Sequence, residues 1–301
     1  MGMLKRATGA AVAAIAAAGY GAAAKAAELL GQPTPGAIDM QPGAAPLRHQ
    51  QMFFHNVILF PITTFIAVFV LGLLLWCAFR YNKRSNPTPA KFSHNTPVEI
   101  VWTVVPVLIL MFIAIFSFKL LYAFHDMPPA DVTVKATGNQ WYWSYEYPDL
   151  KVAEYTSNVV PEDKAPKGLF RLAADNPMVV PVNKVVRVLV TGADVIHSWT
   201  VPAFGVKIDA IPGKMNETWF KAERIGTYYG QCSELCGINH AFMPIQVQVV
   251  SQADFDAWVA SKGGGAAGAA SSAPAASAAP AASSAPAASS APAASSAPAA
   301  H

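Results

Sequence analysis

A short stretch in the last third of the chain combines sulfur and imidazole side chains that could hold a metal. It reads CSELCGINHAFM and supplies Cys232, Cys236, His240 and Met243. Thiolate, thioether and imidazole donors together select copper, and a single-copper electron-transfer site uses one cysteine, two histidines and a weak methionine. Because this stretch has two cysteines, their sulfurs could bridge two copper ions, each capped by a histidine. The second histidine would be His197 in ADVIHSWTVP.

Electron relay, rather than bond making, is the chemistry of such a copper pair. An electron shared over two coppers and two sulfurs changes each bond little, so little reorganisation accompanies its transfer. Two other structures would use some of the same side chains. A disulfide between Cys232 and Cys236 is reasonable in an oxidising compartment, and a structural zinc accepts cysteine and histidine. Neither has a use for Met243, so the stretch as a whole favours copper.

The elements that must position these side chains are short β-strands. From residue 131 to residue 250, segments rich in Val, Ile, Tyr, Trp and Thr alternate with Gly, Pro, Asn and Asp. The segments expected as strands are VTVKATG, WYWSYEY, MVVPV, KVVRVLVTG, ETWFKA, GTYYGQ and IQVQVV. They predict an all-β Greek-key sandwich or barrel over residues 126–262, with the metal-binding stretch on the loop before the last strand.

A second part of the chain is typical of membrane proteins. Of the 301 residues, 53% are apolar and only 13% are charged, which argues against a single soluble domain. Apolar runs cover residues 53–79 and 101–118, and either can cross about 30 Å of hydrocarbon as a helix. The segment between them, RYNKRSNPTPAK, has four basic residues and no acid, which marks the cytoplasmic side. We therefore expect a membrane α-helical hairpin of two transmembrane helices over residues 51–125.

This orientation predicts a multi-pass protein of the bacterial inner membrane, with both termini and the β-domain in the periplasm. Export is also indicated by the start of the chain, where a basic pair precedes an alanine-rich apolar stretch and small residues. Residues 1–26 are therefore expected to be a signal peptide, with a retained apolar anchor as the alternative. Residues 27–50 would form a periplasmic segment before the hairpin. Residues 263–301 repeat SSAPAA almost without charge, which predicts a disordered tail of no assigned function.

Several motifs together resemble one protein family. CSELCGINHAFMP, HSWTVPAFGVKIDAIPGK and QWYWSYEYPD look like the periplasmic copper domain of subunit II of heme-copper cytochrome c oxidases. HNTPVEIVWTVVP, at the start of the second apolar run, is similar to the membrane part of that subunit, and the resemblance extends over residues 41–262. It implies a cupredoxin-like fold in which Cys232 and Cys236 bridge a binuclear copper centre.

The resemblance also implies how the remaining donors are shared between the two coppers. His197 and Met243 would serve one copper, and His240 with the backbone carbonyl of Glu234 would serve the other. The Glu234 side chain would reach a magnesium ion shared with subunit I. The sequence alone gives Glu234 only as a solvated loop acid.

The resemblance also implies that Trp141, in GNQWYWSYEY, receives the electron from cytochrome c. Aromatic residues of strands usually pack in a core, so the resemblance alone gives Trp141 this role. The family usually has histidine where this chain has Asn139, which leaves the local hydrogen bonding open. Residues 126–258 hold 15 acidic and 11 basic residues, and a surface of this sign attracts a basic partner. The acids that match the family's docking site are Glu146, Asp175 and Asp194.

Glu99 in NTPVEIVW has two interpretations. A carboxylate at a helix start is stabilised by the positive end of the helix dipole, which makes Glu99 a capping residue. The resemblance instead places Glu99 at the mouth of a proton channel that runs into subunit I.

These observations predict subunit II of a cytochrome c oxidase, which passes electrons to heme a of subunit I for reduction of oxygen to water coupled to proton pumping. The chain has no CxxCH motif, which excludes a fused c-type heme. The resemblance implies heme in the partner subunit only. The expected partners are subunit I, other oxidase subunits, cytochrome c and the lipid bilayer, and no nucleic acid.

Three alternatives differ in what they would lack or need. The second subunit of a quinol oxidase has the same fold without the cysteine pair. The copper domain of nitrous oxide reductase shares the copper loop but has no membrane hairpin. A copper chaperone favours an open site and needs neither the hairpin nor the aromatic strip around Trp141.

Overall fold

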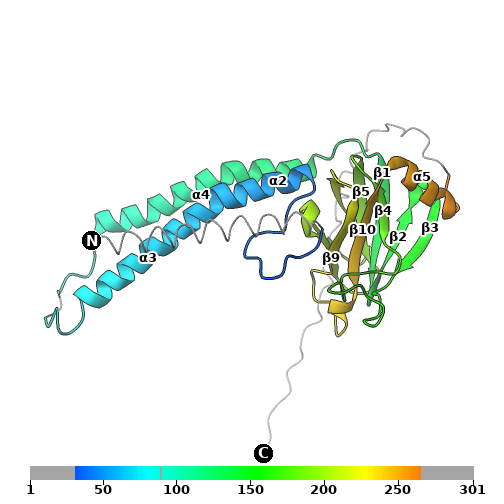
Figure 1. Ribbon diagram of the computed structural model, residues 1–301. Coiled ribbons are helices and arrows are strands. Elements are labelled where there is room, and N and C mark those ends of the chain that lie inside the picture. Colours follow the sequence, from blue (N-terminus) through cyan, green and yellow to red (C-terminus); the bar gives the residue numbers. More distant parts are fainter. Residues whose placement is uncertain (1–30, 89, 266–301) are drawn as a thin grey trace, which may run out of the picture. The chain divides into compact units, whose positions relative to one another are not determined.

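The computed structural model describes residues 31–88 and 90–265. The predicted signal peptide, residues 1–26, lies outside the described residues, and so does the predicted tail apart from its first three residues. The described part consists of long apolar helices and a domain of short strands (Figure 1).

The predicted membrane hairpin is confirmed by two long helical segments. The first is formed by α2 (Pro46–Phe53), the π-helix η1 (Phe54–Leu59) and α3 (Phe60–Arg80), and the second is α4 (Thr96–His125). Both are long and apolar enough to cross a membrane. The helices extend beyond the apolar runs 53–79 and 101–118, because their ends carry polar residues that an apolar count leaves out.

The start of α4 shows how such a polar end is built. The side-chain carbonyl of Asn95 accepts a hydrogen bond from the Val98 N–H at 3.4 Å, as in a helix cap. In return, Glu99 Oε1 accepts the Asn95 N–H at 3.3 Å. Glu99 therefore does cap the helix, whatever further role it has.

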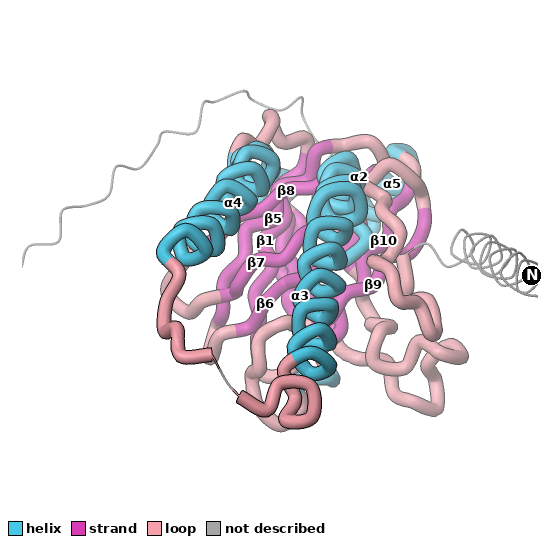
Figure 2. Tube along the Cα trace, turned by 90° about the vertical axis from the view of Figure 1, so that its left-hand side faces the viewer, coloured by secondary structure: helices cyan, strands magenta, loops and turns pink. Residues whose placement is uncertain are grey.

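The β-domain contains ten strands among the described residues, shown in magenta in Figure 2. They are β1 (Val132–Asn139), β2 (Tyr142–Tyr147), β3 (Val152–Ser157), β4 (Met178–Pro181), β5 (Val185–Gly192), β6 (His197–Val201), β7 (Val206–Ala210), β8 (Asn216–Lys221), β9 (Gly226–Gln231) and β10 (Pro244–Val250). One sheet has the order β3-β2-β1-β5-β8, a second has the order β4-β10-β9, and β6 pairs with β7. The pairs β1 with β5 and β4 with β10 are parallel, and all other pairs are antiparallel.

The core follows from the alternation of side chains along these strands. β1 and β5 bury every second residue, so that Val134 and Val188 face inward while their neighbours are partly exposed. Large aromatic side chains fill the space between the sheets, among them Trp143 from β2 and Trp199 from β6, both fully buried. The predicted fold of two transmembrane helices and a β-sandwich is confirmed.

Several elements were not anticipated from the sequence. All seven segments expected as strands contain one, but β3, β6 and β7 were not among them. β3 lies at a sheet edge with Glu154 and Thr156 exposed, and β6 buries four of its five residues, so neither shows clear alternation. The helix α5 (Gln252–Ser261) was also missed, although Ser251 caps it by accepting the Asp254 N–H at 3.2 Å.

Candidate metal centre

The residues predicted to bind copper lie on the loop that joins β9 to β10 and on the adjoining β6. β9 and β10 are antiparallel neighbours, and Gln231 pairs with Pro244, so the two ends of the loop are held side by side. His197 is the first residue of β6. The backbone N–H of Ser233 donates to the carbonyl of Ser198 at 3.1 Å, which ties the loop to the strand that carries the histidine.

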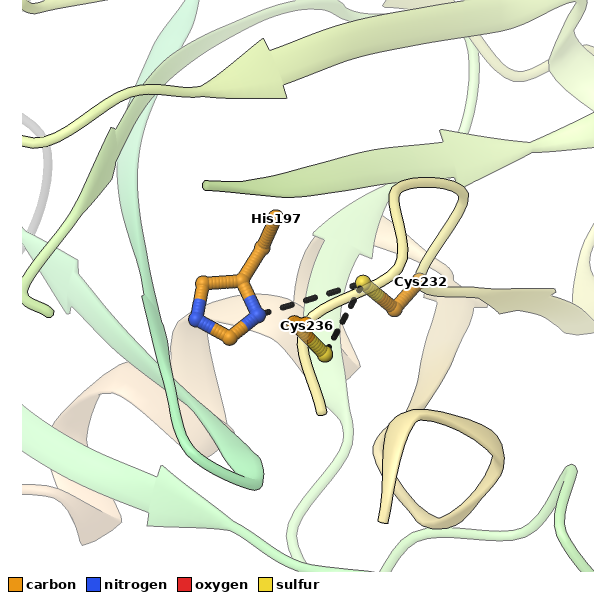
Figure 3. A group of neighbouring side chains, drawn as sticks. All are labelled: His197, Cys232 and Cys236. Atoms are coloured by element: carbon orange, nitrogen blue, oxygen red, sulfur yellow. Dashed lines mark hydrogen bonds between the residues drawn. The ribbon is translucent and has the colours of Figure 1, made fainter. Parts of the chain in front are cut away.

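The two cysteine sulfurs and one imidazole form the tightest group of possible metal donors among the described residues (Figure 3). The sulfurs of Cys232 and Cys236 are 3.9 Å apart, and both cysteines are free thiols rather than a disulfide. Nδ1 of His197 lies 3.9 Å from the Cys232 sulfur. All three side chains are buried. Buried sulfur and imidazole donors, the ligand types that suit a soft metal ion, therefore converge at this point.

The other predicted donors lie beside one or the other sulfur. Nδ1 of His240 is 3.5 Å and Sδ of Met243 is 3.4 Å from the Cys236 sulfur. The carbonyl oxygen of Glu234 is 3.3 Å from the Cys232 sulfur. The structure thus brings together every side chain named from the copper motif, and it gives each sulfur its own set of neighbours.

The metal-free thiols have different proton affinities. Burial opposes ionisation of both, but hydrogen bonds to the Cys232 sulfur, first of all with His197, outweigh it and lower the pKa of Cys232 to about 7. Burial and the neighbouring Cys232 raise the pKa of Cys236 to about 12. Cys232 is therefore the first thiolate to form, and a metal that binds both sulfurs must displace the proton of Cys236.

A carboxylate fixes the orientation of the His197 ring. Oδ1 of Asp194 lies 2.9 Å from Nε2 of His197, which leaves Nδ1 directed at the Cys232 sulfur. Burial of His197 lowers its pKa, but the hydrogen bonds with Cys232 and Asp194 outweigh this effect and raise it. The other carboxylate oxygen of Asp194 accepts the Gln140 N–H at 2.7 Å.

The loop is also held by the turn between β1 and β2. The indole N–H of Trp141 donates to the Cys236 carbonyl at 3.1 Å, and the side-chain amide of Gln140 donates to the same oxygen at 2.8 Å. Gly237 has a φ of +116°, and a Cβ there would lie 3.0 Å from the Trp141 ring, so only glycine permits this contact. Trp141 is thus partly exposed and hydrogen-bonded to the candidate metal loop.

Glycine is needed at a second position for the same reason of close approach. A Cβ at Gly138 in β1 would come within 2.9 Å of the His197 ring. Trp143 meets this ring edge-on, with ring centroids 6.0 Å apart, and donates its indole N–H to the Met243 carbonyl at 3.3 Å. Sequence reasoning missed Gly138, Gln140 and Trp143 as parts of the site. The motif GNQWYW was the signal that could have pointed to them.

Comparison with known proteins gives the family. The model for the periplasmic domain of cytochrome c oxidase subunit II matches residues 132–250, and the model for its transmembrane domain matches residues 33–120. A probable cytochrome c oxidase subunit 2 of Rickettsia bellii is 50% identical over 232 residues, which cover 77% of this chain and 86% of the relative. The chain belongs to the cytochrome c oxidase subunit II family. It is thus part of a heme-copper terminal oxidase complex.

This chain is also similar to a second curated relative and to one solved structure. Cytochrome c oxidase subunit 2 of Cereibacter sphaeroides is 48% identical over 256 residues, covering 79% of this chain and 84% of the relative. The crystal structure of the periplasmic domain of subunit II of cytochrome oxidase of Bradyrhizobium japonicum is 60% identical and covers 46% of this chain and 96% of its own, with a TM-score of 0.43.

Membership in the subunit II family bears on the alternatives considered from the sequence. The match includes both membrane helices and the β-domain, which separates this chain from the copper domain of nitrous oxide reductase and from a copper chaperone. The cysteine pair separates it from the copper-free subunit of a quinol oxidase. Two apolar helices and bacterial oxidase relatives fit an inner-membrane protein with a periplasmic domain.

The other β-domain acids predicted as docking or magnesium residues also contact other residues of this chain. Glu146 lies 3.2 Å from Lys135, and Oε1 of Glu234 lies 3.5 Å from Nζ of Lys207. Asp175 accepts the N–H groups of Asn158 and Asn176, both at 2.7 Å, and so stabilises a turn. Asn139 donates its side-chain N–H to the Thr137 carbonyl at 3.2 Å.

We predict that Asp194→Ala weakens copper binding, because the variant removes the hydrogen bond that orients His197. Loss of such an outer partner typically costs about 10- to 100-fold in metal affinity. Competition with a chelator of known copper affinity, on the purified oxidase, measures the change. Asp194→Asn keeps an oxygen acceptor and should be milder, and Asp149→Asn, which changes the same charge on an exposed residue outside the copper loop, should leave copper binding unchanged. Equal effects of the Asp194→Ala and Asp149→Asn variants would contradict the orienting role.

Proposed function

We propose that this subunit II accepts electrons from cytochrome c at a binuclear copper centre and passes them to heme a of subunit I. The observation that carries the proposal is the pair of free cysteine sulfurs, 3.9 Å apart, each with an imidazole and further soft or carbonyl donors beside it. Reduction of oxygen to water, coupled to proton pumping, would follow in the partner subunit.

The residues that would hold the two coppers follow from the donor set. The set comprises the sulfurs of Cys232 and Cys236, the imidazoles of His197 and His240, the Met243 thioether and the Glu234 carbonyl. Bound in this set, the copper pair supplies a site where one electron is shared over both metals. The chain itself contributes a rigid, largely dry pocket, because both cysteines, His197 and Met243 are buried. Such a pocket restricts rearrangement when the charge changes.

The Glu234 carboxylate faces away from the copper donors. Only its backbone oxygen is beside the Cys232 sulfur, while its side chain is partly exposed and next to Lys207. A carboxylate oxygen is a ligand suited to magnesium. We propose that the Glu234 carboxylate contributes to a magnesium ion shared with subunit I. The backbone carbonyl of the same residue would serve the copper centre.

Trp141 is the residue we propose for reception of the electron. Its indole ring is partly exposed, and its N–H donates a hydrogen bond to the backbone carbonyl of Cys236, one of the two cysteines that would hold the copper pair. The net negative charge of the β-domain suits a basic cytochrome c, and Glu146 and Asp175 would take part in docking. Asp194 would take part in docking as well, and its hydrogen bonds with His197 and Gln140 support a second role beside the metal site.

The hairpin gives the proposed orientation in the membrane. The loop between α3 and α4 carries four basic residues and no acid, which favours the cytoplasmic side. Both termini and the β-domain would then lie in the periplasm, where cytochrome c is met.

Electron paramagnetic resonance of the purified oxidase tests the copper proposal. We expect a hyperfine pattern in which one electron is shared equally over two coppers, in addition to the signals of subunit I. A structural zinc or a disulfide at Cys232 and Cys236 gives no such pattern. Metal analysis that finds zinc, or no metal, in this loop of the intact complex would overturn the proposal.

The proton-channel role of Glu99 can be separated from its capping role. Glu99→Gln keeps a side-chain oxygen that can accept the Asn95 N–H, but it cannot carry a proton. We expect both Glu99→Gln and Glu99→Ala to slow oxidase turnover, with unchanged reduction of the copper centre by cytochrome c. Turnover is measured as oxygen consumption at matched enzyme content. If Glu99→Gln turns over like the parent and only Glu99→Ala is slow, Glu99 is a cap and nothing more.

A further inference from the structure

The turn that carries His240 forms fewer hydrogen bonds with the rest of the domain than the cysteine half of the copper loop. Its backbone hydrogen bonds are local, from the His240 N–H to the Gly237 carbonyl at 3.2 Å and from the Phe242 N–H to the Asn239 carbonyl at 2.8 Å. The Cys236 carbonyl, in contrast, receives two side-chain donors from another part of the domain. At the end of the turn the Met243 carbonyl receives the Trp143 indole N–H at 3.3 Å, so the part without a hydrogen bond from outside the loop, among the described residues, is residues 240–242. Side-chain packing is what can hold these residues beside Cys236.

Phe242 provides that packing. The short helix η4 (His240–Phe242) ends on it, and Met243 follows directly. The Phe242 ring meets Phe170, on the loop between β3 and β4, edge to face with centroids 6.2 Å apart. The guanidinium carbon of Arg171 lies 4.4 Å from the Phe242 centroid and 5.3 Å from the Phe170 centroid. A cation over an aromatic face is attracted by the ring quadrupole, so Arg171 attracts Phe242 from the solvent side.

Arg171 also contacts the opposite end of the copper loop. Gln231 is the last residue of β9 and directly precedes Cys232, and its side-chain amide donates to the Arg171 carbonyl at 3.5 Å. Among the described residues, Arg171 forms no ion pair with an acid. Arg171 therefore contacts both ends of the copper loop: its guanidinium contacts Phe242 and its backbone carbonyl contacts Gln231.

The segment that presents Arg171 is itself fixed to the sheet. The backbone N–H of Ala174 donates to the side chain of Gln246, in β10, at 2.8 Å. Val160 N–H donates to the Ala173 carbonyl at 3.0 Å, and Asp175 closes the base of the loop on Asn158. Arg171 is therefore held relative to the strand that begins immediately after Met243.

We propose that Arg171 is a positioning residue of the metal centre, which acts through Phe242 to keep His240 and Met243 beside the Cys236 sulfur. The inference rests on the proposed function, since it concerns retention of copper in this loop. Arg171 touches no donor atom. Its removal loosens the turn, so that the imidazole and the thioether leave the metal more often and copper escapes faster.

Four single variants of the full-length subunit and one double variant, Arg171→Gln with Phe242→Leu, test this role in the purified oxidase. Arg171→Gln removes the charge and keeps a polar side chain, Arg171→Lys keeps a cation, and Phe242→Leu removes the ring. Lys167→Gln is the matched control, because Lys167 is exposed in the same segment and forms no ion pair with a described residue. Each sample is incubated with excess EDTA, and the decay of the shared-electron copper signal is followed by electron paramagnetic resonance.

We expect Arg171→Gln to lose the signal about twofold to fivefold faster than the parent, in keeping with one cation over a ring. Arg171→Lys should be close to the parent, and Lys167→Gln should match it. Because the charge acts through the ring, Arg171→Gln should add nothing further in a Phe242→Leu background. Hydrogen exchange of a peptide covering residues 237–243 should rise in Arg171→Gln and stay unchanged in Lys167→Gln.

Two results would overturn the inference and leave the proposed function intact. One is equal copper loss from Arg171→Gln and Lys167→Gln in a parent that shows the shared-electron signal. The other is an Arg171→Gln effect of the same size with and without the Phe242 ring. A parent oxidase without this copper signal would instead overturn the proposed function, and the inference with it.

Discussion

Replacing either Cys232 or Cys236 by serine is expected to abolish the spectrum of the copper pair and electron transfer to heme a. A thiolate is the metal-binding form of cysteine, whereas a serine hydroxyl stays protonated and is a far poorer bridge. Each sulfur has its own neighbouring donors: His197 and the Glu234 carbonyl lie beside Cys232, and His240 and Met243 lie beside Cys236. The remaining cysteine therefore cannot take over the role of the one that is replaced. Electron paramagnetic resonance and the rate of heme a reduction in the purified oxidase measure the two losses.

The two serine variants should fail in different ways. Cys232→Ser leaves Cys236 with His240 and Met243, a set close to that of a single-copper site, so any copper that remains should show a localised hyperfine pattern. Cys236→Ser removes the sulfur that both of these side chains adjoin and should leave less copper. Full electron transfer to heme a in either variant would contradict the copper assignment.

Two other substitutions provide the comparison for the serine variants. Met243→Leu should be milder, with an altered potential and copper affinity but an occupied site, because methionine is a weak ligand in electron-transfer copper sites. Cys77→Ser should behave like the parent, since Cys77 lies exposed on α3 and belongs to no donor group among the described residues.

The grouping of the candidate metal donors could be predicted because it depends on residue type and local spacing. Four of the side-chain donors come from one loop, and a loop between two paired strands keeps its residues together whatever the rest of the fold does. The membrane hairpin was equally accessible, since a long apolar run has few alternatives to a transmembrane helix. The strands β1 and β5 could be predicted because buried and partly exposed residues alternate regularly along them.

The support of the site could not be derived in the same way. The bond between Asp194 and His197 is local in sequence, but the sequence does not show that this acid turns inward rather than toward a partner. The contacts of Gln140 and Trp141 with Cys236 join residues nearly a hundred positions apart. They depend on how β1 and β2 lie against the copper loop, and this packing is a property of the whole sandwich.

Docking of cytochrome c should respond to surface acids and not to Trp141. Glu146→Gln and Asp175→Asn are expected to lower the association rate and to flatten its salt dependence, because they remove charge from the β-domain surface and opposite charges are screened over about 8 Å at physiological ionic strength. Asp194 is left out of this comparison, since its carboxylate also orients His197. Stopped-flow mixing with reduced cytochrome c over a range of salt concentrations measures both quantities.

Trp141→Phe is expected to give the opposite result, with nearly normal binding and salt dependence but slower electron transfer within the complex. Phenylalanine keeps an aromatic ring but loses the indole N–H that joins Trp141 to the Cys236 carbonyl, while the Gln140 amide still holds the loop. We expect transfer at saturating cytochrome c to slow by about tenfold or more, equivalent to a barrier higher by about 1.4 kcal/mol. The copper spectrum must be unchanged for this loss to be assigned to the route of the electron. Normal transfer in Trp141→Phe would place reception of the electron elsewhere, first at the partly exposed Tyr142, because Trp143 is fully buried.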